Sequence, residues 1–253
     1  MQITFDLIYK EGKEGHVVAE NNLYQHIHFP EMLTRYDSNF LEFNKQPSLS
    51  EFKEAAHFLR EFHKSKGQKH VKFYFPQDVK PSQELMDFFA REKFEVGFNE
   101  LYSIAPDQFP PLEDNPDIEI KVVSDQDLDA YLEFQYQQDL EFGEEFAQQK
   151  IDLHKRHFQD ENFIQLLAYY RGTPAGSVDV IIKSDTAEID GLMVQESFQK
   201  KGIGSKLQER VMKKFPNKTV ILLADGEDTP RLMYQRQNYR YGGFKYEVQK
   251  VYE

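Results

Sequence analysis

The chain of 253 residues contains neither cysteine nor tryptophan. Without cysteine the protein has no disulfide bond, no zinc site with thiolate ligands and no cysteine nucleophile. No apolar run approaches the roughly 20 residues that a membrane-spanning helix needs. The first residues, Met1 to Asp6, also lack the basic segment followed by an apolar run that marks a signal peptide. These absences predict a cytoplasmic protein with no membrane partner.

Basic residues are in the minority. The chain has 31 Lys and Arg against 43 Asp and Glu, which gives a net charge of −12 at pH 7. Proteins that bind nucleic acids usually present a basic face, so we expect no nucleic-acid partner. The same excess of negative charge favours a cationic small molecule or peptide as a partner.

A proline-rich segment divides the sequence. Residues 105–117 contain Pro106, Pro110, Pro111 and Pro116, with acidic residues between and beside them. Proline removes a backbone N–H donor and disfavours helix in the residue before it, so this segment is predicted to be an extended linker. We therefore predict a first domain at residues 1–104, a linker at 105–117 and a second domain at 118–253.

The spacing of apolar residues predicts an α/β fold of the mixed α+β kind, in which each domain is a mostly antiparallel sheet flanked by helices. In the first domain it predicts helices at 52–63 and 85–90 and strands at 71–75, 94–98 and 101–104. The second domain is predicted to have strands at 118–123, 163–169, 175–182, 187–194 and 220–224, with helices at 128–135, 146–158, 203–215 and 229–237. The tail at 240–251 is expected to close the sheet of the second domain.

The segment from Gln199 to Gly204 connects a predicted strand to a predicted helix. The first N–H groups of a helix have no acceptor within it, and the helix dipole adds partial positive charge there. A phosphate group is a common occupant of such a position. Gly202 and Gly204 let the backbone approach a ligand closely, and Lys200 and Lys201 add positive charge. The segment is therefore predicted to bind an anion.

The same segment resembles motif A of the GNAT superfamily, the acetyl-CoA-dependent N-acetyltransferases, whose signature is Gln or Arg, two residues, Gly, one residue, then Gly or Ala. The resemblance implies that the pyrophosphate of coenzyme A is held by Gln199, Lys200, Lys201, Gly202, Ile203, Gly204, Ser205 and Lys206. It also implies that the strand backbone at Leu192, Met193 and Val194 pairs with the pantetheine arm. Two competing phosphate-binding motifs, Gly-x-x-x-x-Gly-Lys-Ser/Thr and Gly-x-Gly-x-x-Gly, are absent.

The resemblance also implies a general acid. The family places a tyrosine in its last helix at a fixed distance before Gly-Phe, and Tyr234 stands at that distance before Asn238 and Tyr239. Asn238 replaces the glycine, and asparagine tolerates the left-handed backbone conformation that such a turn needs. A phenol, with a pKa of about 10, is protonated at neutral pH and can give its proton to a departing thiolate. The alternative is that Tyr234 is only a packing aromatic.

The general base is less well defined by the sequence. Glu188 lies 199 − 188 = 11 residues before Gln199, the spacing of the catalytic glutamate in GNAT histone acetyltransferases. Asp190 is expected on the same face of the strand, and Gly191 is predicted to mark a β-bulge. Two alternatives stay open: a chain of water molecules acts as the base, or both carboxylates simply face solvent.

Two other clusters of polar residues stand out in the second domain. His154 and His157 are three residues apart, whereas the zinc-protease motif needs a spacing of four, so we expect no metal site. Four acidic residues lie in the segment that covers the acceptor site in GNAT proteins, namely Asp139, Glu141, Glu144 and Glu145. They suit a cationic acceptor, although a run of charges is more often a solvated surface.

The two halves resemble distant repeats of one domain. Phe94 in the first half aligns with Tyr239, which places Phe89 opposite Tyr234. The segment before the helix at 52–63 contains Pro47 and no paired glycines, so it cannot offer a complete set of N–H donors to a pyrophosphate. The sequence therefore resembles a tandem GNAT protein with a degenerate N-terminal copy.

The function that the resemblance implies is transfer of an acetyl group from acetyl-CoA to a primary amine, by direct attack in a ternary complex. The acceptor, a small molecule or a peptide, is expected to be cationic. The first domain is expected to form one wall of the acceptor cleft or the surface of a homodimer. The alternative is a non-catalytic module that binds acyl-CoA or regulates. The sequence identifies neither the acceptor nor the oligomeric state.

Overall fold

The computed structural model describes residues 3–5, 14–227 and 231–252. The chain forms two compact units, one of residues 1–101, 224–231 and 241–253 and the other of residues 102–223 and 232–240. The first unit thus combines the N-terminal segment with two segments from near the C-terminus. Within the described ranges, no helix is long and apolar enough to cross a lipid bilayer.

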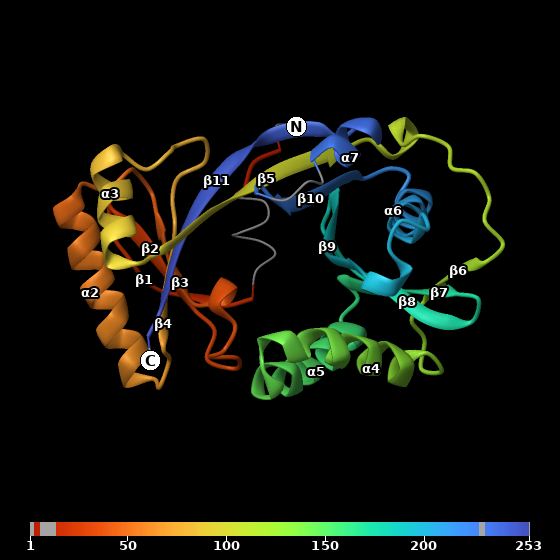
Figure 1. The fold of residues 1–253 in the computed structure, drawn as a ribbon, viewed down its shortest axis with the longest axis horizontal. Coiled ribbons are helices and arrows are strands. Elements are labelled where there is room, and N and C mark those ends of the chain that lie inside the picture. Colours follow the sequence, from red (N-terminus) through yellow and green to blue (C-terminus); the bar gives the residue numbers. More distant parts are fainter. Residues whose placement is uncertain (1–2, 6–13, 228–230, 253) are drawn as a thin grey trace. The chain divides into compact units, whose positions relative to one another are not determined.

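The first unit contains a mixed sheet with the strand order β1-β2-β3-β4-β11-β5 (Figure 1). Its strands are β1 (His16–Glu20), β2 (Tyr24–His28), β3 (Phe40–Phe43), β4 (His70–Tyr74), β5 (Glu95–Ile104) as far as residue 101, and β11 (Arg240–Val251) from residue 241. β3 and β4 run parallel, and the pairs β1–β2, β2–β3 and β4–β11 are antiparallel. A short 3₁₀ helix, Tyr36–Ser38, precedes β3. β5 is one continuous strand, so the prediction of two strands at 94–98 and 101–104 is wrong.

Two helices cover one face of this sheet, α2 (Leu49–Ser65) and α3 (Gln83–Glu92). α2 begins with a capping box: the Ser48 hydroxyl accepts from the Glu51 N–H at 3.3 Å, and the Glu51 carboxylate accepts from the Ser48 N–H at 2.8 Å. Both helices pack apolar residues into a single core that is rich in phenylalanine. Its buried aromatic members are Phe43, Phe52, Phe73, Phe75, Phe88 and Phe89.

The C-terminal strand β11 corrects the prediction that residues 240–251 close the sheet of the second half. Its residues 247–251 pair antiparallel with residues 70–74 of β4, in the first unit. Val248 is fully buried in the phenylalanine-rich core, and the Lys250 ammonium donates to the Glu92 carbonyl at 2.7 Å. The sequence pattern indicates a strand, but a strand's partner depends on which sheet offers an unpaired edge and a complementary apolar face.

The second unit contains a sheet with the order β10-β9-β8-β7-β6. Its strands are β6 (Ile118–Val122), β7 (Phe163–Tyr170), β8 (Thr173–Ile182), β9 (Thr186–Val194) and β10 (Thr219–Asp225). β9 and β10 are parallel and the other pairs are antiparallel. Short 3₁₀ helices are formed by Pro106–Gln108, Leu140–Phe142 and Glu196–Phe198. The predicted mixed α/β fold with mostly antiparallel sheets is confirmed.

Figure 1 shows α4 (Leu128–Asp139) and α5 (Glu144–Gln159) on one face of the second sheet and α6 (Ile203–Lys214) on the other. Tyr131, Leu132 and Phe134 of α4 form a core cluster with Val123 and Leu167. The short helix α7 spans Arg231–Arg236. It matches the predicted helix at 229–237 in part, and residues 229 and 230 of that prediction lie outside the described residues.

A cluster of four buried histidines lies in the first unit. His26 and His28 come from β2, His63 from α2 and His70 from β4, and each is less than a tenth exposed. The His63 ring lies 4.5 Å from the His70 ring, and the His26 ring lies edge-on to Phe62 at 4.5 Å. Burial lowers the pKa of His26 and of His63 to about 4 and that of His70 to about 3, and the neighbouring histidines add to the effect.

We predict that acid destabilises the first unit through this cluster. In the unfolded chain each histidine titrates near pH 6.5, so the unfolded state takes up protons first as the pH falls. The free energy of unfolding should hold above pH 6.5 and fall between pH 6.5 and about 4, by at most about 1.4 kcal/mol per pH unit for each histidine. Denaturant titrations from pH 7.5 to 5 measure this slope.

The variant H26F keeps the edge-on ring contact and removes one titrating group, so its slope should be smaller than that of the wild type. His57 is exposed on α2, and H57F, which removes no buried imidazole, is the matched control. A free energy of unfolding that stays constant from pH 7.5 to 5 would contradict the prediction.

Candidate functional site

The site begins where β9 and β10 part. Their parallel pairing runs from Thr186 and Thr219 to Ile189 and Leu222 and stops there. Within the part of the chain that the structure describes, residues 190–194 of β9 pair with β8 and with no residue of β10. The strand therefore keeps a row of backbone N–H and C=O groups that an extended ligand can pair with.

A β-bulge lies at the same point. Asp190 of β9 pairs with Asp179 of β8, and Met193 of β9 pairs with Ser177 of β8. Between these two pairs the chain advances three residues on β9 but only two on β8. Gly191, within the extra stretch, has a φ of +57°, which glycine adopts without strain. The predicted bulge at Gly191 is confirmed, and it re-aims the amides of the following residues away from a regular ladder.

Gly176 on β8 is a residue that the sequence analysis missed. A Cβ at this position would lie 2.7 Å from the Met193 carbonyl oxygen and 3.2 Å from Cγ2 of Ile203. Only a glycine lets β9 and the first residue of α6 approach β8 this closely. The sequence signal for it was a glycine in the middle of an apolar strand.

The predicted phosphate loop forms a concave turn at the start of α6. Lys200 has a φ of +61° and Gly202 a φ of +87°, so the backbone reverses twice before the helix. The side-chain amide of Gln199 donates to the Val194 carbonyl at 3.4 Å, and the Lys201 ammonium donates to the Ser197 carbonyl at 3.1 Å. Such an alternation of left-handed and extended residues arranges successive N–H groups around a hollow that suits an anion.

The helix adds its own donors to this hollow. The Lys206 N–H donates to the Gly202 carbonyl at 3.0 Å, so the N–H groups of residues 203–205 have no acceptor inside the helix. A cavity of about 320 Å³ opens beside them, and part of its wall comes from the predicted linker. It is lined by Leu112, Glu113, Asp114, Asn115, Ile118, Lys201, Gly202, Ser205 and Lys206. The structure thus brings four of the predicted coenzyme-binding residues to one cavity.

Tyr234 lies on α7 and is 8% exposed. Its ring packs against Tyr102 at 5.0 Å and Tyr239 at 5.4 Å. The Gln237 side-chain amide donates to the Ser205 hydroxyl at 3.1 Å. This hydrogen bond connects the residue after α7 to the first turn of α6. Asn238 has a φ of +66°, so the predicted left-handed turn after this helix is confirmed.

The two carboxylates considered as bases have different environments. Glu188 is 5% exposed and forms an ion pair with Lys183, whose ammonium lies 3.3 Å from Glu188 Oε2. Asp190 is exposed at the point where β9 leaves β10. Both residues lie in the regular register before the bulge, and their surroundings differ because β10 pairs with β9 at Glu188 but, among the described residues, not at Asp190.

The predicted acidic cluster also divides. Glu141, Glu144 and Glu145 are exposed around the junction of α4 and α5. Asp139 is buried, and its Oδ2 lies 3.9 Å from Nε2 of His154. The exposed members are available to attract a cation, whereas Asp139 belongs to the interior of the unit.

A buried polar network joins α4, α5 and β8. The Tyr131 hydroxyl donates to Asp179 Oδ1 at 2.6 Å and lies 3.1 Å from Nδ1 of His154, and the Gln135 amide donates to that hydroxyl at 2.8 Å. Burial, followed by the Asp179 charge, raises the pKa of Tyr131 well above 10. Burial alone would lower the pKa of His154, but Asp139 and Asp179 outweigh it and raise that pKa.

Asp179 was not anticipated by the sequence analysis. Burial would raise the pKa of its carboxyl group, but contacts with His154 and then Tyr131 lower it. The available signal was a single carboxylate between Val178 and Val180, inside an apolar strand.

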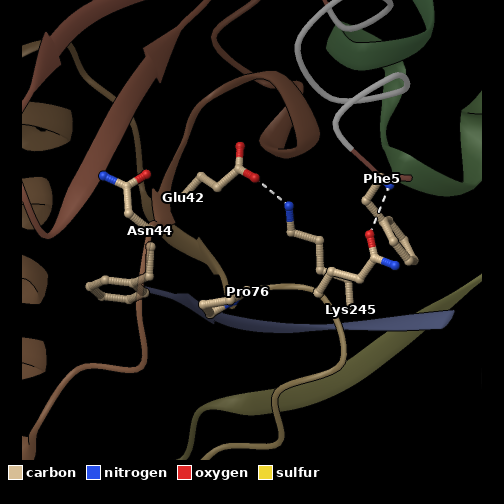
Figure 2. Close-up of a pocket in the computed structure, with 7 residues that line it drawn as sticks. Phe5, Glu42, Asn44, Pro76 and Lys245 are labelled. Atoms are coloured by element: carbon tan, nitrogen blue, oxygen red, sulfur yellow. Dashed lines mark hydrogen bonds and ion pairs between the residues drawn. The ribbon is translucent and has the colours of Figure 1, made fainter. Parts of the chain in front are cut away.

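The first unit has a smaller cavity of about 200 Å³, shown in Figure 2. It lies just beyond Glu42 and Tyr74, where the parallel pairing of β3 and β4 ends. The Lys245 ammonium of β11 forms an ion pair with Glu42, and both side chains are buried. The other lining residues are Phe5, Phe43, Asn44, Pro76 and Gln77. The charges of the two ionisable groups thus compensate each other inside the cavity wall.

We predict that G176A destabilises the second unit. The new methyl group would press on the Met193 carbonyl, which is backbone and cannot rotate away, so we expect a loss of about 1–3 kcal/mol in the free energy of unfolding. The control is G97A, also in a strand, where the Cβ would meet only the Glu247 side chain at 3.7 Å. Denaturant unfolding compares the two, and equal stabilities would contradict the proposed close approach.

Two family models match the chain. Residues 3–102 match a domain of unknown function, DUF5613, and residues 126–239 match the acetyltransferase (GNAT) family. The chain has no significant match among curated proteins.

Solved structures match over nearly the whole chain. A functionally unknown conserved protein from Staphylococcus epidermidis ATCC 12228 is 30% identical, with a TM-score of 0.88 and coverage of 99% of this chain and 98% of that one. A GCN5-related N-acetyltransferase from Kribbella flavida is 12% identical, with a TM-score of 0.61 and coverage of 96% and 91%. A tandem GNAT protein from the clavulanic acid biosynthesis pathway is 8% identical, with a TM-score of 0.55 and coverage of 90% and 78%.

The last two structures share the fold with this chain. The Staphylococcus epidermidis protein is also similar to this chain in sequence, and that similarity extends over both units. The chain therefore belongs to the same family as that protein, and its residues 126–239 form a GNAT acetyltransferase domain.

Proposed function

We propose that the second unit transfers an acetyl group from acetyl-CoA to a primary amine. The observation that carries the proposal is the combination of an unpaired strand edge at residues 190–194 with a donor-lined hollow at the start of α6. An extended pantetheine arm suits the strand edge, and a pyrophosphate suits the N–H groups and lysines of the loop. The two features adjoin in sequence and share Val194, to which the Gln199 side chain is bonded.

The surroundings of several predicted coenzyme-binding residues support this proposal. Leu192, Met193 and Val194 supply the strand edge, and Gly202 supplies the left-handed turn that begins the helix. Lys200 and Lys201 are exposed beside the hollow, so their charges are available to phosphate oxygens. Ile203 is buried and anchors the helix start, while a Cβ added at Gly204 would lie 3.6 Å from Val194 Cγ2 and 3.7 Å from Leu192 Cδ2.

The proposed reaction is direct attack of the neutral amine on the thioester carbonyl. The new C–N bond forms as an oxyanion develops, and collapse of this intermediate breaks the C–S bond and releases coenzyme A as a thiolate. The amides that the bulge re-aims near Gly191 are our candidates for stabilising the oxyanion. Tyr234 is our candidate for giving a proton to the thiolate.

The amine must also lose a proton. Glu188 is the candidate base from the sequence, and its ion pair with Lys183 occupies one of its carboxylate oxygens. A chain of water molecules that acts as the base is retained as the alternative. The exposed Glu141, Glu144 and Glu145 favour a cationic acceptor, because they concentrate negative charge at the junction of α4 and α5.

We further propose that the first unit is a degenerate copy of the same domain. Both units contain a parallel strand pair bridged by a helix, β3–α2–β4 and β9–α6–β10. The turns after α3 and α7 also match: Lys93 and Asn238 both have left-handed φ values, and the N–H groups of Phe94 and Tyr239 donate to the carbonyls of Phe89 and Tyr234 at 2.9 and 3.0 Å. These matches support the alignment that places Phe89 opposite Tyr234.

The two copies differ where a coenzyme would bind. From the last parallel pair to the first residue of the helix, the first unit has 49 − 42 = 7 steps and the second has 203 − 189 = 14. The shorter connection contains Pro47 and leads directly into the Ser48 capping box, whose side chains already accept from the N–H groups of Ser48 and Glu51. We therefore assign coenzyme binding to the second unit alone, with one coenzyme A per chain.

A non-catalytic function, binding of acyl-CoA without turnover, is the second candidate. The observation that favours it is the close packing of the Tyr234 ring between Tyr102 and Tyr239, which suits a structural aromatic. The two candidates share the coenzyme site and differ in whether coenzyme A is released as a free thiol when an amine is supplied.

We predict that G202V abolishes acetyl-CoA binding. A Cβ at Gly202 has no atom within 4 Å, so the valine side chain would project into the open hollow and block the phosphates. G67V is the matched control, because Gly67 also has a positive φ of +79° and no atom within 4 Å of an added Cβ, and it lies in the first unit, outside the proposed site. Isothermal titration with acetyl-CoA should give one site for wild type and G67V and none for G202V. Since Gly202 has a positive φ, circular dichroism must first show that G202V is folded, and undiminished binding in the folded variant would overturn the proposal.

We predict that Y234F lowers turnover by roughly ten- to a thousand-fold with little change in acetyl-CoA affinity, because it deletes a proton donor and keeps the ring. Y239F is the matched control: its hydroxyl donates to Gln208 Oε1 at 2.8 Å, inside the protein, so its loss should reduce stability rather than turnover. Thiol release with a panel of amines measures both variants. Full activity in Y234F would leave Tyr234 as a packing residue.

A further inference from the structure

Three side chains that the proposed acetyl transfer does not use come together in the second unit. His154 and His157 lie on α5, one turn apart, and Asp179 lies on β8. One potential ligand atom from each lies within 4.8 Å of the others. Two imidazoles and a carboxylate are a donor set that zinc and related divalent transition metals accept.

The surroundings of the three residues resemble a prepared outer shell. Asp179 Oδ2 lies 3.4 Å from His154 Nδ1, while Asp179 Oδ1 accepts from the Tyr131 hydroxyl at 2.6 Å. The Gln135 amide in turn donates to that hydroxyl. Carboxylates that bind metals are typically held in this way by a second hydrogen bond, which leaves the other oxygen directed at the metal.

His154 has a carboxylate beside each of its ring nitrogens. Its Nδ1 faces Asp179, and its Nε2 faces Asp139 Oδ2 at 3.9 Å. Both Nε2 and Asp139 Oδ2 are buried without a hydrogen-bond partner in the described structure. A metal on Nδ1 requires the remaining ring proton on Nε2, and that proton then points to the Asp139 carboxylate, as in carboxylate–histidine–metal triads.

His157 is held by an aromatic neighbour at the more exposed side of the three-residue cluster. Its ring stacks on Phe163 with 3.9 Å between centroids and 9° between planes. It is only partly buried, whereas His154 and Asp179 are buried, so it provides the side from which an ion can enter.

We propose that His154, His157 and Asp179 bind one divalent transition-metal cation of the zinc type. The ion replaces the protons on the coordinating nitrogens, which leave to solvent, and a water molecule completes its coordination. Because the ligands come from α5 and β8, the ion links the helix to the sheet and stabilises the second unit. The proposal does not depend on acetyl transfer.

The test uses the full chain, freed of metal by a chelator and titrated with Co²⁺ alone. The wild type should bind one equivalent, with the visible absorption of low-coordinate Co²⁺, and its melting temperature should rise with Co²⁺ or Zn²⁺. H157Q should lose the absorption, and D139N should weaken binding by about 10- to 100-fold, as loss of an outer-shell carboxylate does elsewhere. H57Q, which removes an exposed imidazole far along the sequence on α2, should bind as the wild type does.

Failure of the wild type to take up one equivalent at millimolar Co²⁺ would overturn the proposal, and so would equal binding by H157Q and H57Q. If H157Q does not fold, H157N and the wild-type titration decide the matter by the same readouts. Acetyl-CoA binding serves as a separate check, since it should persist in H157Q whether or not the ion binds.

Discussion

The functional part of the second unit depends on one constraint: β9 can pair with β10 only as far as Ile189. Beyond that residue a bulge at Gly191 turns the strand, and Gly176 on the opposite neighbour allows β9 and α6 to lie close to β8. The strand edge is thereby left open just before the chain turns into a helix whose first N–H groups lack acceptors. An open edge followed by a donor-rich helix start is the physical basis for assigning a long, anionic ligand to this place.

The first unit, which we propose to be a copy of the same architecture, differs from the second unit at this place. It has a parallel strand pair, a bridging helix and a left-handed turn at Lys93. The connection before α2 is short, and the Ser48–Glu51 capping box accepts from two of the N–H groups at the start of the helix, those of Ser48 and Glu51. Where the strands part, an ion pair between Glu42 and Lys245 lines the small remaining cavity. In the first unit, two of the N–H groups at the helix start are therefore bonded within the protein.

Buried histidines have different electrostatic surroundings in the two units. In the first, four histidines are held neutral by burial, and each therefore makes the unit sensitive to acid. In the second, His154 lies between the carboxylates of Asp139 and Asp179, which favour a cation at its position. The first arrangement excludes charge, whereas the second attracts it, and the presence or absence of nearby carboxylates accounts for the difference.

The sequence by itself determined the helices, most strands and the loop at 199–204, because these depend on local periodicity, glycine and nearby caps. It did not determine that β11 pairs with β4, or that residues 94–104 form one strand, because pairing depends on edges and faces contributed by distant segments. Nor did it indicate that Asp179 joins His154, or that Lys183 holds Glu188. Side chains on different helices and strands meet only when the sheet fixes its register, so the electrostatic environment of a residue was decided by the tertiary structure.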